Sequence, residues 1–312
     1  MNLKVGNGIM RTKDSLPISK ALYALNYYLS HQKNPFNKWG VEVGIAREMP
    51  SNDNVFPSPI LGHNSTILFG MGTPSFPATK NIEFNYQKSD FYRGLLFSIS
   101  VSGALIKNEN SISFYNYNDH GVISYFTATE IVRMTNNFHL EKYFHEIKLK
   151  TIIESNGLYM KSPERINNTD TVQSLLSKEF KFTAISNFKG FFNAEVSSSL
   201  LRSSVSGQRI KSNISNTIYQ YRHSLKLKAA LGKRVYANFH FTGTDYKGIN
   251  VFYAGNGSIQ WTVNKSLKSS ILFHNIFNNS RFIEKQYDLY GSNTRIYFLE
   301  KRYILFSLAL DL

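Results

Sequence analysis

The histidines are the first residues of this 312-residue chain whose type could support metal chemistry. There are eight of them, and no pair has the spacing of a helical zinc motif. His139 and His145 flank an expected turn, which favours solvated side chains over a pair of ligands. The chain has no cysteine, which excludes disulfides and zinc sites built on thiolates. We therefore expect no metal and no cofactor.

Two glycine-containing segments and two glutamates are the other candidates for chemistry. Gly232-Lys233-Arg234 lacks the preceding glycine of a phosphate-binding loop and is typical of a hairpin turn. Residues 255–258 do not fit the Gly-x-Ser-x-Gly frame of a nucleophile elbow. Glu42 and Glu83 are expected to face a lumen, and nothing in the sequence pairs them as acid and base. The sequence thus predicts no catalytic residue and no enzyme.

The charge balance is strongly basic, with 36 Lys and Arg against 21 Asp and Glu and a net charge of +15. Basic chains rich in aromatic residues can bind nucleic acid. Here the lysines are spread over turns and alternate strand faces, with no dense patch. This distribution favours solvated rims, a polar lumen and affinity for an anionic outer leaflet over binding of nucleic acid.

Alternation of apolar and polar residues dominates the elements that must carry these side chains. In residues 234–246, Val235, Phe239 and Phe241 alternate with polar residues, and residues 94–106 and 223–231 show the same period of two. No long run has a period of 3.6, and no segment has the roughly 20 apolar residues of a membrane helix. The pattern predicts an all-β chain and leaves membrane strands open.

Strand length separates the candidate β folds. Strands of soluble proteins centre on about 5–6 residues, whereas a tilted membrane strand needs about 9–11. Many segments here exceed ten residues, which favours an antiparallel transmembrane β-barrel of about 14 strands. The expected strands are 3–12, 18–31, 38–49, 80–89, 94–107, 120–141, 146–160, 170–187, 190–204, 215–231, 234–246, 252–264, 267–278 and 293–312.

The expected connections alternate between short and long, as in an outer-membrane barrel with short periplasmic turns and long external loops. Short turns are expected at 34–37, 89–93, 142–145, 188–190, 232–234 and 264–266. Longer loops are expected at 50–78, 108–119, 161–169, 205–214, 247–251 and 279–292. Aromatic residues beside the short turns predict an interfacial girdle: Phe36, Trp39, Phe91, Tyr92, Tyr143, Phe144, Phe188, Phe191, Phe192, Tyr236 and Trp261. The polar faces predict a lumen lined by Lys148, Lys150, Lys226, Lys228 and His240.

Two segments resemble the barrels of TonB-dependent outer-membrane receptors. Residues 72–77 followed by 81–86 resemble the place where a long loop re-enters that barrel, and residues 271–278 are similar to its penultimate strand. The layout looks most like the C-terminal barrel portion of the Bacteroidetes-type outer membrane beta-barrel family. The motif positions, to which the resemblance assigns a structural role, are Gly72, Pro74, Glu83, Tyr86, Asn275, Phe277 and Asn278.

The resemblance implies a transport protein that takes up a siderophore, an oligosaccharide or a similar nutrient. It implies as partners outer-membrane lipid, a small nutrient ligand, a separate plug and TonB system, and a surface lipoprotein. The family barrel has about 22 strands, and its plug, TonB-contacting segment and signal peptide have no counterpart here. Residues 1–312 are therefore expected to be one barrel domain of a larger receptor. Location in a Gram-negative outer membrane assumes an export signal outside this chain.

The sequence departs from the family pattern at Thr73, at Pro77-Ala78-Thr79 and at the final residue, Leu312. It therefore leaves two alternatives open. One is a passive pore closed by about 14 strands. The other is a soluble β-protein that binds carbohydrate, in which outward rows such as Tyr23, Leu25, Tyr27 and Leu29 would be an aggregation liability. No substrate-binding residue is identified.

Overall fold

The structure is a computed structural model of the chain. It describes residues 2–10, 18–34, 36–47, 60–61, 67–69, 76–117, 120–166, 169–186, 192–209, 212–232, 234–247, 250–264, 267–287 and 292–310. No helix in these ranges is long and apolar enough to cross a membrane.

All regular elements of the described chain are β-strands. They are β1 (Asn2–Met10), β2 (Ile18–Asn34), β3 (Asn37–Arg47), β4 (Ile60–Leu61), β5 (Ile67–Phe69), β6 (Ala78–Asp90), β7 (Leu95–Lys107), β8 (Glu109–Tyr117), β9 (His120–Ala128), β10 (Ile131–Phe144), β11 (Leu149–Ile166), β12 (Thr169–Ser186), β13 (Phe192–Arg209), β14 (Ser212–Leu231), β15 (Val235–Tyr246), β16 (Asn250–Thr262), β17 (Leu267–His274), β18 (Arg281–Tyr287), β19 (Ser292–Phe298) and β20 (Tyr303–Leu310).

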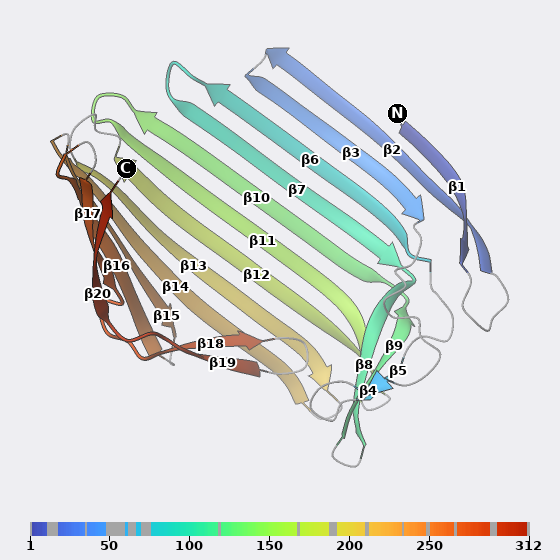
Figure 1. Ribbon diagram of the computed structural model, residues 1–312. Coiled ribbons are helices and arrows are strands. Elements are labelled where there is room, and N and C mark those ends of the chain that lie inside the picture. Colours follow the sequence, from blue (N-terminus) through green and yellow to red (C-terminus); the bar gives the residue numbers. More distant parts are fainter. Residues whose placement is uncertain are drawn as a thin grey trace.

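Fourteen strands form one antiparallel wall in chain order: β1, β2, β3, β6, β7, β10 to β17, and β20. The wall curves along its width, and β15, β16, β17 and β20 turn back at the left of Figure 1. No pairing of described residues joins β1 to β20, so the sheet is an open part of a barrel. The prediction of an all-β, antiparallel barrel wall of about 14 strands is confirmed.

The connections divide between the two rims as predicted. The links from β2 to β3, β6 to β7 and β10 to β11 are short and lie together at one end of the wall (Figure 1). The opposite end carries β4, β5 and the β8–β9 hairpin. Two expected loops, 161–169 and 205–214, were too long: β11 and β12 pair up to Ile166 and Thr169, and β13 and β14 up to Arg209 and Ser212.

Two expected strands are also wrong, because each spans a hairpin arm and a wall strand. Residues 120–141 are divided at Thr129 and Glu130 into β9, which pairs with β8, and the wall strand β10. Residues 293–312 are divided into β19, which pairs with β18 in a separate sheet, and the wall strand β20. Alternation is the same in both kinds of strand, so the period of two does not reveal which neighbour a strand takes.

Almost no apolar residue in the described ranges is enclosed by protein. The buried apolar side chains there are Phe76, Val122, Ala128, Ile131 and Tyr246. By contrast, Phe180, Val196 and Phe306 are 50%, 47% and 56% exposed. A soluble β-sandwich requires a dry layer between its sheets, so this distribution contradicts that alternative.

Glycine at the β6–β7 turn is required by geometry. Gly94 has φ of +58°, and a Cβ there would lie 2.8 Å from the carbonyl oxygen of Tyr143. Gly232, in the β14–β15 turn, has φ of +74° with no atom within 4 Å of such a Cβ. We expect Gly232→Ala to cost about 1–2 kcal/mol from the left-handed backbone. Gly94→Ala should cost at least about 1 kcal/mol more, because the backbone of β10 must shift.

Urea unfolding of both variants in lipid vesicles measures this difference. Equal destabilisation of the two variants would contradict the proposed close approach of β10 to Gly94.

Candidate functional site

The concave face of the wall is polar, and it is the candidate functional surface. Strand register places Asn85, Ser100, Asn137 and Asn156 on one face of β6, β7, β10 and β11, while Phe84, Val101 and Phe138 lie on the other. A hollow of about 530 Å³ opens on the polar face and spans β2, β3, β6, β7, β10 and β11. Because six neighbouring strands share this hollow, the polar face must be the concave side of the wall.

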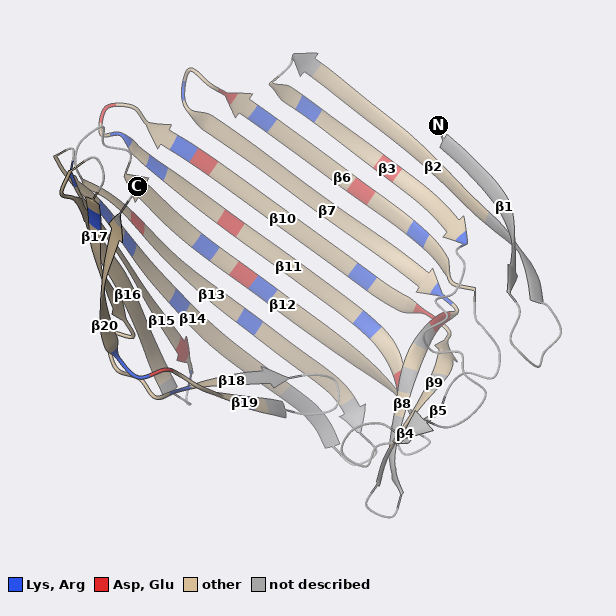
Figure 2. Ribbon diagram, in the orientation of Figure 1, with Lys and Arg blue, Asp and Glu red and all other residues tan. Residues whose placement is uncertain are grey.

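Ion pairs cross the middle strands of this face. Glu154 on β11 lies 2.9 Å from Lys181 Nζ on β12 and 3.6 Å from His139 Nδ1 on β10. Glu141 on β10 lies 2.8 Å from Lys150 Nζ on β11. Figure 2 shows basic and acidic residues together on each of β10, β11 and β12. Such partly exposed pairs contribute about 0.2–1 kcal/mol each, so their main effect is to give the wall a mixed, hydrophilic lining.

The larger hollow combines amide, hydroxyl and aromatic groups. Its lining includes Tyr28, Asn85, Ser100, Asn137 and Asn156. The Tyr28 ring lies across a glycine of β3, and its hydroxyl oxygen would be 2.6 Å from a Cβ added there. The lining also includes the cation Lys38 and the carboxylate Glu154. The hollow therefore offers hydrogen-bonding, aromatic and charged groups to a polar solute.

A second hollow of about 290 Å³ lies on the same face at β13 to β16. Lys228, Asn238, Ser258 and Gln260 line it, together with Tyr236. This hollow is smaller, and its described lining includes the cation Lys228 but no carboxylate.

The strand register places two residues of the expected aromatic girdle on the inner face of the wall instead of the outer face. Tyr236 belongs to the inner wall, because its neighbours Val235 and Ala237 take the outward positions. Tyr143 is directly opposite Lys150, which is also an inner residue. Proximity to a short turn therefore did not decide which face an aromatic residue takes.

The other expected lumen residues divide between wall and turn. Lys150, Lys226, Lys228 and His240 take inner positions; Lys226 Nζ lies 2.8 Å from Glu195, and His240 Nε2 lies 3.1 Å from Ser224 Oγ. Lys148 was wrongly assigned to the lumen. It lies in the turn that joins β10 to β11, with φ of +49°, because the chain reverses there before the alternation of β11 begins.

The two candidate glutamates lie directly opposite each other on β3 and β6. Glu83 Oε1 accepts a hydrogen bond of 2.8 Å from Asn85 Nδ2. Within the described ranges no ion pair joins Glu42 to a cation, and no group of three or more His, Cys, Asp or Glu residues could hold a metal ion. The pair makes this part of the inner wall acidic, and it presents no acid–base geometry with a third group.

The family-motif positions fall into three places. Gly72 and Pro74 lie outside the described residues. Glu83 faces inward, and Tyr86 faces outward with its ring 5.7 Å from that of Phe97. Their assignment as motif positions stays a prediction.

The predicted strand 267–278 is wrong at its C-terminal end, where Asn275 and Asn278 lie. β17 ends at His274, and the rest of the expected strand does not form. Both asparagines have positive φ, 48° and 55°, which asparagine tolerates better than most residues. Phe277 lies in the same turn, 49% exposed, with its ring 6.1 Å from that of Phe241. The chain leaves the wall here and begins the connection to β18.

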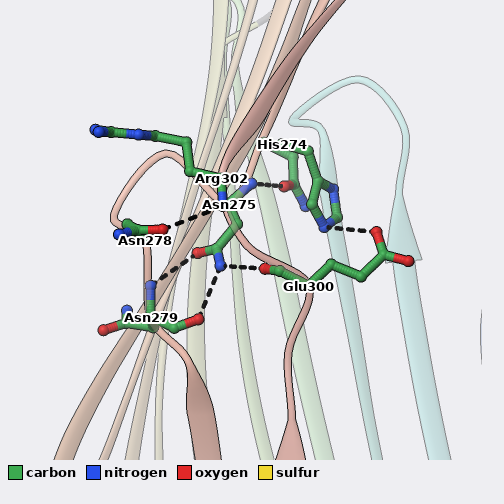
Figure 3. A network of polar contacts seen from close by, with 7 residues as sticks. His274, Asn275, Asn278, Asn279, Glu300 and Arg302 are labelled. Carbon is green, nitrogen blue, oxygen red and sulfur yellow. Dashed lines mark hydrogen bonds and ion pairs between the residues drawn. The ribbon is translucent and has the colours of Figure 1, made fainter.

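An asparagine network fastens this turn to its surroundings (Figure 3). Asn275 Nδ2 donates to the carbonyls of Asn279 and Glu300, at 2.8 and 2.7 Å, and its Oδ1 accepts from the Asn279 N–H at 3.1 Å. Asn256 Oδ1 on β16 accepts from the Asn275 N–H at 2.9 Å. Asn278 Oδ1 accepts from the Arg302 N–H at 3.1 Å. The two ends of the connection from residue 275 to residue 302 are thereby held together on the wall.

Sequence reasoning missed this network and the ion pairs of Glu154. Alternation alone put Glu154 and Lys181 on polar faces, but the register decides that they meet. A signal for the asparagine network was present in the group of three asparagines at 275, 278 and 279, since asparagine favours turns and left-handed backbone.

No protein-family model matches the chain, and no curated protein matches its sequence. Its fold is similar to solved structures of two variants of the ferric enterobactin receptor PfeA from Pseudomonas aeruginosa. The TM-score is 0.51 for both, with 8% and 9% sequence identity over 89% of this chain and 44% of the receptor. The chain thus spans less than half the length of these receptors. The fold is that of part of an outer-membrane β-barrel.

Proposed function

We propose that the chain forms part of the barrel of an outer-membrane transport protein, a TonB-dependent receptor for a small nutrient such as a siderophore or an oligosaccharide. The observation that carries this proposal is the division of the wall into an exposed apolar convex face and a polar, ion-paired concave face. A wall of this kind is stable where hydrocarbon meets one side and water or polar protein meets the other.

The remaining parts of the proposal rest on the family resemblance. They are an export signal outside this chain, a single domain over residues 1–312, membership of the Bacteroidetes-type family, and partners that include a plug and TonB system and a surface lipoprotein. In hydrocarbon the backbone groups along the free edges of β1 and β20 must be paired. We infer that further strands of a longer receptor close the barrel there, in keeping with the length of PfeA. A catalytic role is not proposed.

Fractionation of the source cells tests location. The protein should sediment with outer membranes and resist extraction by urea. Recovery in the soluble fraction, monodisperse without detergent, would contradict the proposal.

Uptake tests the transport role. Labelled ferric catecholate, ferric hydroxamate and a labelled oligosaccharide are supplied to cells with and without the gene. At least one should accumulate only when the gene is present, and a protonophore should abolish that accumulation. Uptake that survives the protonophore, together with single-channel conductance of the inserted protein, would instead support the passive pore.

A further inference from the structure

Three basic residues gather on the convex face where the apolar band ends. Lys178 on β12 lies directly opposite Arg202 on β13, and both are exposed. Arg202 Cζ lies 5.8 Å from the centre of the Tyr219 ring on β14, and Lys247 Nζ, after β15, lies 5.3 Å from it. We call Lys178, Arg202, Tyr219 and Lys247 the rim patch.

The position of the rim patch matches a lipid headgroup. Along the same face, the next residues towards the short turns are Phe180 on β12 and Leu200 on β13, which pair with each other. Phe180 is 50% exposed. The patch therefore lies at the edge of the surface that hydrocarbon would cover, on its side away from the short turns. Beyond the patch, β12 continues to Thr169 and β13 to Arg209.

The charges of the rim patch have no counter-ion in the described part of the protein. No ion pair joins Lys178, Arg202 or Lys247 to a carboxylate there. Asp245 is on the same face, opposite Tyr221, and it makes no ion pair with them. Like charges directly opposite each other on neighbouring strands destabilise a sheet. An anion bound between Lys178 and Arg202 would remove this repulsion.

We propose that the rim patch binds the phosphate group of a glycolipid in the outer leaflet. This inference rests on the proposed membrane location but not on the transported solute. The guanidinium of Arg202 and the ammonium of Lys178 donate charge-assisted hydrogen bonds to phosphate oxygens. The acyl chains lie along Phe180 and Leu200, and the Tyr219 ring lies at the headgroup level.

The test measures lipid retained by the full chain in detergent micelles, by native mass spectrometry. The probes are diphosphorylated lipid A, the same lipid with both phosphates removed, and inorganic phosphate. Wild type should retain the phosphorylated lipid at least about ten-fold more tightly than the dephosphorylated one. The double variant Lys178→Gln/Arg202→Gln should lose that preference. The matched control Arg222→Gln/Lys228→Gln removes two cations from the inner face of β14 and should keep it.

A charge-preserving variant separates binding from folding. Lys178→Arg/Arg202→Lys should retain the phosphorylated lipid, and heat-modifiability gels report whether each variant is folded. Equal retention by wild type and the Lys178→Gln/Arg202→Gln variant would overturn the inference, as would equal retention of the two lipids by wild type. Full competition by millimolar inorganic phosphate would show a site for free phosphate and would also overturn it. A wild-type chain that stays soluble without detergent contradicts the proposed function itself, so the two failures are distinguishable.

Discussion

Replacing Val196 by arginine is expected to destabilise the membrane-inserted protein by about 2–4 kcal/mol, the cost of an arginine near the middle of a lipid-facing strand. Val196 lies on the convex face of β13, between Phe192 at the short-turn end and Arg202 at the rim patch. Its cross-strand partners are Ala184 and Leu225. No polar group of the outward face is opposite it, so the guanidinium must reach for the interface or draw water into the bilayer.

The next residue supplies the control. Ser197 lies at the same depth but on the concave face, opposite Thr183 and Ser224. Ser197→Arg should change the free energy of unfolding by less than about 1 kcal/mol, because water and hydroxyl groups surround it. Urea unfolding in lipid vesicles, followed by tryptophan fluorescence, measures both variants.

The pair of variants distinguishes a membrane wall from a water-soluble sheet. Val196 is 47% exposed, and in water an arginine at such a position is nearly neutral. If Val196→Arg were as stable as Ser197→Arg, the convex face would not contact lipid.

Replacing Asn275 by alanine is expected to cost about 2–4 kcal/mol and to loosen the connection from residue 275 to residue 302. The side chain is 6% exposed and makes hydrogen bonds to Asn279 and Glu300. Its loss leaves backbone groups unpaired, at about 1–3 kcal/mol. Alanine also tolerates the φ of +48° poorly.

Two further variants separate these causes. Asn275→Gly keeps the backbone angle accessible and removes only the side-chain hydrogen bonds. Asn275→Asp keeps the acceptor for the Asn279 N–H but turns a carboxylate oxygen towards the carbonyl oxygens of Asn279 and Glu300, which repel it. Limited proteolysis of residues 275–302 should rank the chains as wild type most resistant, then Asn275→Gly, and then Asn275→Ala and Asn275→Asp. Equal protection of wild type and Asn275→Ala would show that the network does not hold this connection.

The wall was predictable because a β-strand has a simple period. Val235, Phe239 and Phe241 alternate with Tyr236, Asn238 and His240, and the structure places the two sets on opposite faces. Strand length then favoured membrane strands over soluble ones, and β11, β13 and β14 are even longer than expected. The hairpins β8–β9 and β18–β19 were not predicted, because their residues alternate just as wall residues do.

The amino-acid sequence by itself determined the strands, their two faces and the alternation of short and long connections. These features depend on residues that are neighbours in the chain, and local sterics and hydrophobicity are sufficient for them. Only the tertiary structure decided that Glu154 meets Lys181, that Lys178 lies beside Arg202, and that Asn275 joins Asn279 to Glu300. Those contacts depend on register and on turns between distant segments, where a shift of one residue exchanges the faces of a strand.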